Sequence, residues 1–226
     1  MHSFSGSHNP EPDTSSILAA DMGTTNIVVS CGNETVRIRN PQTRYGSDII
    51  SRILYSMNGG GSALTAALHK GLFEAFSLLY EKIQGRTSTA KTGTSPFPLN
   101  KMVLTGNTVM MHFLAGLETY GMASYPFTAV SLFNYECKVS DIFPGIDFSR
   151  VSHLFSPEAS VYLPPCIEAF AGGDLVCAAA GCFLYGQDPK LPSAHLPQPP
   201  SRLLIDIGTN TEILLFESFE MYDDID

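Results

Sequence analysis

Apolar and polar positions follow one arrangement twice along this chain. Residues 17–30 read ILAADMGTTNIVVS and residues 203–216 read LLIDIGTNTEILLF. Each copy has an apolar run that ends in Asp, a Gly-Thr step, and a second apolar run. Short apolar runs on both sides of a Gly-containing turn are typical of two strands that are joined tightly. We therefore predict strands over 17–21 and 26–31, and a second strand pair near the other end of the chain.

Between the two copies, the pattern predicts helices and strands in turn. Residues 34–40 alternate apolar and basic side chains, as an edge strand does. Apolar residues have helical spacing over 46–57, 63–83, 107–117 and 166–186, and short strands are expected over 101–106 and 160–165. Ser62 is the expected N-cap of the helix over 63–83. Residues 118–158 are rich in aromatic residues, Pro and Gly, and their pattern predicts no particular element.

Composition divides the chain into four parts. Residues 1–16 are polar and contain Pro, so we expect a flexible N-terminal tail. Residues 187–201 carry five prolines, which a helix interior or a central strand does not accept, and we expect a linker there. The remaining parts are a first lobe over 17–186 and the start of a second, incomplete lobe over 202–226.

Charge and apolar content exclude two classes of partner. The formal net charge is −9, and the 13 Lys and Arg residues form no cluster. Nucleic acids bind mainly through basic side chains that neutralise phosphates, so we expect no nucleic-acid partner. No apolar run is long enough to cross a bilayer, and the N-terminus lacks the pattern of a signal peptide. We therefore expect a cytoplasmic protein with no membrane partner.

The five cysteines predict no metal or disulfide site. Their number is odd and no CxxC pair occurs, which argues against a disulfide framework and against zinc. Cys177 and Cys182 are five residues apart, so a helix would point them in different directions and no further cysteine is near. We expect buried, reduced thiols and no iron-sulfur cluster.

The repeated turn has the chemistry of a phosphate site. A buried strand that ends in Asp21 or Asp206 places a carboxylate at the edge of the sheet where α/β proteins bind ligands, and there it can hold Mg²⁺ directly or through water. Gly23 and Gly208 allow close backbone approach, and the Thr and Asn residues that follow supply donors for phosphate oxygens. One such turn could equally be a self-capped hairpin. Two copies favour a clamp around the phosphates of a nucleotide.

Three further positions are candidates for function. Gly106, Asn107 and Thr108 lie where a strand meets a helix N-terminus, which suits an anion contact or an ordinary N-cap. We interpret His112 as a core or surface histidine rather than as a contact to a ligand. Residues 44 and 45, an Arg-Tyr pair near an Asp, predict either a partner-docking loop or an exposed turn.

The chain resembles a known superfamily. Both turns resemble the two phosphate motifs of sugar and acetate kinases, heat-shock chaperone ATPases and actin. Five blocks are similar to the ATPase domain of the reductive activators of corrinoid proteins: NPQTRYGSDIISRI, MVLTGNTVMMHFLAG, YPFTAV, VYLPPCIEAFAGGD and LLIDIGTNTEILL. The resemblance implies an α/β fold, namely a ribonuclease-H-like, actin-type ATPase lobe with a mixed sheet, followed by the first hairpin of a second lobe.

The resemblance also implies roles for individual residues. The expected ligands are ATP and Mg²⁺, with Asp21 and Asp206 near the metal ion and with Asp174 and Asp206 as catalytic carboxylates. The residues expected to bind the nucleotide are Asp21, Gly23, Thr24, Thr25, Asn26, Gly106, Asn107, Thr108, Gly208, Thr209 and Asn210.

The function implied is ATP-dependent reduction of Co(II) to Co(I) on the corrinoid protein of a methyltransferase system. The expected partners are that corrinoid protein, an electron-donor protein and, in a homodimer, a second copy of the chain. Because the second lobe is nearly absent, we expect this chain by itself to turn over little or no ATP. Two alternatives stay open: a small-molecule kinase of the same superfamily, and a non-catalytic module that docks on a corrinoid protein.

Overall fold

The computed structural model describes residues 17–89, 96–145, 147, 151–185, 202–208 and 211–216. The expected tail over 1–16 and the linker over 187–201 lie outside the described residues.

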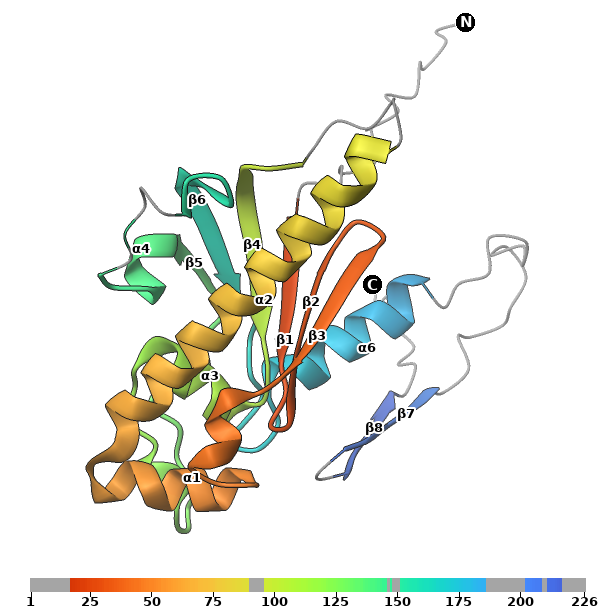
Figure 1. Ribbon diagram of the computed structural model, residues 1–226. Coiled ribbons are helices and arrows are strands. Elements are labelled where there is room, and N and C mark those ends of the chain that lie inside the picture. Colours follow the sequence, from red (N-terminus) through yellow and green to blue (C-terminus); the bar gives the residue numbers. More distant parts are fainter. Residues whose placement is uncertain are drawn as a thin grey trace, which may run out of the picture.

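A six-stranded mixed sheet forms the centre of the molecule, with the strand order β3-β2-β1-β4-β6-β5 (Figure 1). The strands are β1 (Ile17–Met22), β2 (Asn26–Cys31), β3 (Glu34–Arg39), β4 (Leu99–Thr105), β5 (Tyr135–Lys138) and β6 (Phe155–Leu163). The first three form an antiparallel meander, β4 and β6 run parallel to β1, and β5 is antiparallel to β6. The predicted mixed α/β sheet and its edge strand are confirmed.

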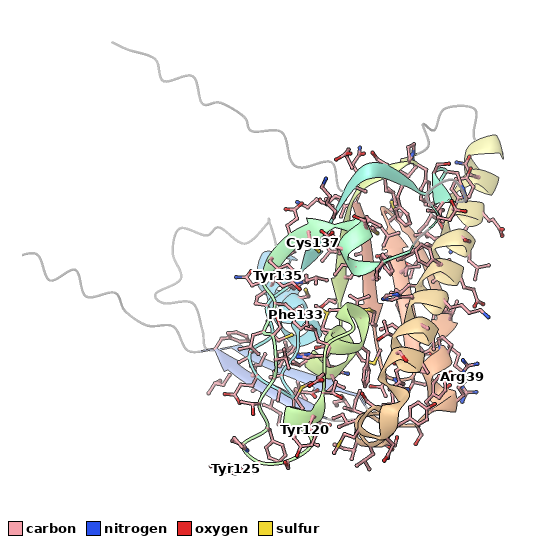
Figure 2. The ribbon with its side chains drawn as sticks, turned by 90° about the vertical axis from the view of Figure 1, so that its left-hand side faces the viewer. Arg39, Tyr120, Tyr125, Phe133, Tyr135 and Cys137 are labelled. Carbon is pink, nitrogen blue, oxygen red and sulfur yellow. The ribbon has the colours of Figure 1, made fainter. Side chains whose placement is uncertain are left out.

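Helices cover both faces of this sheet. They are α1 (Ile49–Tyr55), α2 (Gly61–Thr89), α3 (Thr108–Ala115), α4 (Val139–Ile142) and α6 (Gly173–Tyr185), with short helical turns η2 (Pro41–Arg44), η3 (Ser56–Gly60) and η4 (Tyr120–Met122). Helix α2 lies on one side of the sheet, whereas α6 lies on the other side together with a separate hairpin (Figure 2). That hairpin consists of β7 (Arg202–Ile207) and β8 (Thr211–Phe216).

The core lies between the sheet and α2. Leu18, Ala20 and Met22 alternate along β1 and are fully or almost fully buried, because successive side chains of a strand point to opposite faces. Helix α2 contributes an apolar stripe in which Phe76 is fully buried and stacks edge-to-face on Phe155 at 5.4 Å. The opposite face of β1 carries Asp21, which therefore lies on the α6 side.

The structure corrects three local predictions. Ser62 is not the N-cap of α2, because the helix already begins at Gly61; the non-helical backbone angles of Asn58 and of Gly59 (φ +89°) in η3 separate α2 from α1. The helix predicted over 166–186 begins only at Gly173, and a turn closed by a Glu168–Ala171 bridge precedes it. Residues 118–158 contain β5 and α4, which their irregular composition did not reveal.

The cysteines are free in the described part of the chain, as predicted, although they are not all buried. Cys31 and Cys166 are buried, Cys137 and Cys177 are half-buried, and Cys182 is exposed near the end of α6. Among the described residues, no helix has the length and apolar character needed to cross a membrane.

Candidate functional site

A polar cleft of about 670 Å³ opens at the carboxyl end of β1. Of the residues predicted to form the site, those that line it are Asp21, Gly23, Thr24, Thr25, Asn26, Asn107, Asp174, Asp206 and Gly208. Gly106 and Thr108 lie behind the wall of the cleft, and both are buried. Thr209 and Asn210 lie outside the described residues. The fold thus brings together segments that are distant in the sequence.

The turn between β1 and β2 forms one wall of the cleft. A Cβ atom on Gly23 would approach the carbonyl oxygen of Asn26 to 2.8 Å, so the turn requires glycine at this position. The amide of Asn40 donates to the Gly23 carbonyl at 2.8 Å, and Arg52 donates to the Thr24 carbonyl at 2.5 Å. The carbonyls of the turn therefore point into the protein.

Arg52 is a fully buried cation that the sequence did not mark as part of this site. Its guanidinium also donates to the Gln42 side chain at 3.1 Å and to the Gly46 carbonyl at 3.1 Å. Burial lowers its pKa to about 10, and the nearby Asp48 partly opposes that shift. The group stays charged at neutral pH, since its pKa lies well above 7. Arg52 thus positions the turn without lining the cleft.

The junction of β4 and α3 forms the floor of the cleft. Asn107 is the N-cap of α3, because its side-chain oxygen accepts from the Met110 amide at 3.0 Å. Its amide group also donates to the Thr24 hydroxyl at 3.4 Å, which connects this junction to the first turn. The two interpretations of this segment are therefore compatible: Asn107 caps the helix and lines the cleft. Thr108 donates to the carbonyl of Glu168 and has a packing role.

Helix α6 brings Asp174 to the cleft. The Asp174 backbone amide donates to the Gly106 carbonyl at 3.2 Å, which anchors the start of the helix at the β4–α3 junction. Gly172 makes this approach possible, because a Cβ atom there would lie 2.3 Å from the Cα atom of Asn107. Glu168 is not on this helix and does not line the cleft.

The hairpin β7–β8 supplies the opposite wall. Asp206 pairs with Glu212 across the two strands, so their side chains lie on the same face, and both line the cleft. Glu212 was not predicted from the sequence as a site residue, because it belongs to the second strand rather than to the turn. Arg37 on β3 also lines the cleft and was missed, because an edge-strand arginine normally marks a solvated surface.

Carboxylates crowd this cleft, and burial together with neighbouring charges raises the pKa of Asp21, Asp174 and Glu212. Burial and the charges of Asp174 and Asp206 raise the pKa of Asp21 to about 6, and Arg37 partly opposes them. Burial and Asp206 also raise the pKa of Asp174. Burial, Asp206 and Asp174 raise the pKa of Glu212. Solvent reaches Asp21 through the open cleft, so its burial is only partial. The rise in its pKa therefore depends on the neighbouring carboxylates as well as on burial.

This donor set suits a hydrated divalent cation. Among the described residues, no three His, Cys, Asp or Glu side chains converge closely enough to hold a metal directly. Mg²⁺ keeps several of its waters and commonly binds through one or two carboxylates together with substrate phosphates. The facing carboxylates Asp21 and Asp206 fit such an ion, because a cation between them would relieve their repulsion.

Two other candidates lie elsewhere. His112 is fully buried: Nδ1 contacts the Thr108 carbonyl at 2.7 Å, and Nε2 accepts from the amides of Val130 and Ser131. It is a core histidine, as predicted. Arg44 is exposed and lies over the Tyr45 ring at 4.6 Å, outside the cleft. A docking role for this pair stays a prediction.

Comparison with known protein families identifies the family of this chain. The family model described as the RACo middle region matches residues 17–187. This match covers well over half of the chain. The chain belongs to the RACo middle region family.

One solved structure with a similar fold is described as a reductive activator for corrinoid, iron-sulfur protein. It superposes with a TM-score of 0.61 at 24% sequence identity, over 90% of this chain. The aligned part makes up 30% of that protein, so this RACo middle region chain spans about a third of its length. No curated protein sequence matches.

Proposed function

We propose that this chain binds the phosphates of Mg-ATP in the cleft between the β1–β2 turn and the hairpin β7–β8. One observation carries the proposal: the two Asp-x-Gly segments, distant in sequence, line the same cleft from opposite sides. Paired loops of this kind would grip a phosphate chain through backbone donors and a shared metal ion. The raised pKa of Asp21 supports this assignment, because crowded carboxylates favour a cation.

In this proposal Asp21 and Asp206 would hold Mg²⁺ through water, and the ion would neutralise the charge of the phosphates. Thr24, Thr25 and Asn107 would donate hydrogen bonds to phosphate oxygens. Asp174 would orient the attacking water and accept its proton. A raised pKa suits this task, since a general base works best when its pKa is close to the working pH.

We further propose that ATP use serves the reductive activation of a corrinoid protein. Membership of the RACo middle region family supports this role over a small-molecule kinase. In a longer protein, the binding of nucleotide between two lobes would favour a closed state, and closure would be coupled to the cobalt centre of the partner. The partner and an electron donor would be separate proteins or domains.

A titration of the chain with Mg-ATP tests the phosphate site. Asp21→Asn and Asp206→Asn should each weaken binding by roughly tenfold to a hundredfold, since charge-assisted contacts contribute about 1.5–3 kcal/mol. Glu158→Gln is the control, because Glu158 is exposed on β6 and does not line the cleft. Equal affinity in all four proteins, measured by calorimetry, would contradict the proposal. Reduction of Co(II) in a corrinoid protein with and without ATP, followed spectroscopically, tests the proposed pathway.

A further inference from the structure

Arg37 lies in the same row of the sheet as Asp21. The strand register pairs Asp21 with Val28 and Val28 with Arg37. Directly paired residues of neighbouring strands point to the same face, so all three side chains project toward the cleft, and all three line it. Neighbouring strands are about 4.8 Å apart, which places the backbone of Arg37 roughly 10 Å from that of Asp21. An extended arginine side chain spans most of this distance across Val28.

Arg37 is also the one basic side chain among the described residues that line the cleft. Four carboxylates face it, from Asp21, Asp174, Asp206 and Glu212. Its charge opposes the rise in the pKa of Asp21. The guanidinium thus acts on the cleft electrostatically in the absence of any ligand, although β3 is an edge strand whose side chains on this face are exposed.

We propose that Arg37 is the anion-binding residue of this cleft. In the ligand-free protein its guanidinium shares the cleft with four carboxylates, and when a Mg-nucleotide enters it binds the phosphate oxygens. This inference rests on the proposed function and adds a specificity-determining residue to it.

The physical basis is an exchange of counter-ions. A divalent cation takes over the neutralisation of the carboxylates, which leaves Arg37 without an acidic partner and beside the incoming phosphates. Arginine suits this role because its planar guanidinium offers paired donors that match two phosphate oxygens. The other donors at the cleft, such as Thr24, Thr25 and Asn107, are neutral. Without Arg37, the charged side chains that line the described part of the cleft would all be acidic.

Arg39 provides a matched control on the same strand. It lies two residues further along β3 and is also exposed, but it does not line the cleft. Figure 2 shows it on the opposite side of the ribbon from the hairpin. Arg37→Gln and Arg39→Gln each remove one positive charge, so they change the net charge of the protein equally. Both positions are exposed on an edge strand, and we expect the two variants to melt within a few degrees of the unmodified protein.

The test uses Mg-ATP and Mg-triphosphate as probes. Arg37→Gln should weaken the binding of both by about tenfold or more, Arg37→Lys should lose only part of the affinity, and Arg39→Gln should change it by less than about twofold. Tight binding by the unmodified chain that survives Arg37→Gln would overturn the role of Arg37 alone. An absence of binding by the unmodified chain would overturn the proposed function and the phosphate role of Arg37 together.

Discussion

At the scale of single residues, the cleft and the core use polar groups in opposite ways. Asp21 sits among other carboxylates, and its pKa is raised to about 6 by burial, Asp174 and Asp206. Buried His112, by contrast, is matched on both ring nitrogens by backbone partners. The crowded carboxylates of the cleft lower the folding stability and suit a ligand, whereas the hydrogen bonds of His112 stabilise the loop that contains Val130 and Ser131.

Asp21→Asn should stabilise the folded chain at neutral pH. A carboxyl group whose folded pKa is raised favours folding below its unfolded pKa of about 4, and this contribution is lost as the pH rises through about 6. The neutral amide avoids that loss. We expect a higher melting temperature than that of the unmodified protein at pH 7.5, and a difference that shrinks toward pH 4. A lower melting temperature at pH 7.5 would show that the Asp21 carboxylate is not repelled in the cleft.

His112 should make the fold sensitive to mild acid. Burial lowers its pKa below the ordinary 6.5, so the folded state binds fewer protons than the unfolded state. The stability contributed by the neutral ring is present above about pH 6.5 and is lost as the pH falls below it. His112→Gln should lower the stability at pH 7.5 by about 1–3 kcal/mol, because two backbone amides lose their acceptor, and it should also reduce the loss between pH 6.5 and 5.

Urea unfolding at several pH values measures this effect. Exposed His153 provides the control, and His153→Gln should retain the acid-dependent loss. Some loss should persist in His112→Gln, since burial also lowers the pKa of His69. If His112→Gln loses as much stability between pH 6.5 and 5 as the unmodified protein does, His112 is not a source of the acid sensitivity.

At the scale of elements, the site depends on how α6 meets the β4–α3 junction. Gly172 lies against the backbone of Asn107, and the Asp174 amide binds the Gly106 carbonyl. These contacts involve backbone atoms, which cannot move aside as a flexible side chain could. The position of the Asp174 carboxylate therefore depends on glycine at position 172, where a side chain would not fit.

Gly172→Ala should damage both fold and site. The added Cβ would lie 2.3 Å from the Asn107 Cα, so α6 or α3 must shift, and we expect a loss of at least about 1–3 kcal/mol together with weaker Mg-ATP binding. Gly181→Ala on the same helix is the matched control, since a Cβ atom at Gly181 would meet no other atom within 4 Å. That change should stabilise α6 by about 0.5–1 kcal/mol. Chemical denaturation measures the free energy of unfolding of both variants. Equal values would contradict the expected role of Gly172.

At the scale of the whole molecule, the cleft joins the sheet to a hairpin that has few other contacts with it. The hairpin exposes one apolar face, on which Ile207 is 80% exposed, and turns Asp206 and Glu212 toward the sheet. A two-stranded hairpin is marginally stable alone. The position of β7–β8 beside β1 can therefore be tested by its effect on residues of the sheet.

Asp206→Asn should lower the pKa of Asp21 from about 6, because Asp206 is one of the charges that raise it. Carboxyl NMR of the ligand-free protein measures this coupling between the two walls. Glu158→Gln, which is outside the cleft, should have no effect on Asp21. If Asp206→Asn also has none, the hairpin does not lie over the cleft in solution, and the two-sided phosphate site would be wrong.

The sequence by itself determined the elements and the chemistry of the turns. Period-two and helical patterns located the first three strands, β4, α3 and the hairpin, because burial on one face imposes these periods. It also marked Asp21 and Asp206, because the same apolar run, Asp and Gly-Thr step occur twice. It placed the start of α6 too early, because the apolar segment over 166–172 resembles a helix locally while its backbone turns to pack against Asn107.

Only the tertiary structure decided which residues share the cleft. Arg37, Glu212 and the buried Arg52 carry no local signal, since an arginine on a strand or helix is ordinarily solvated. Their roles come from strand register and from helix packing, which bring them to the site from separate parts of the sequence. Local patterns reflect the face that an element buries, whereas the neighbours that this face meets depend on contacts between distant segments. For that reason the turns could be predicted from the sequence and the completed cleft could not.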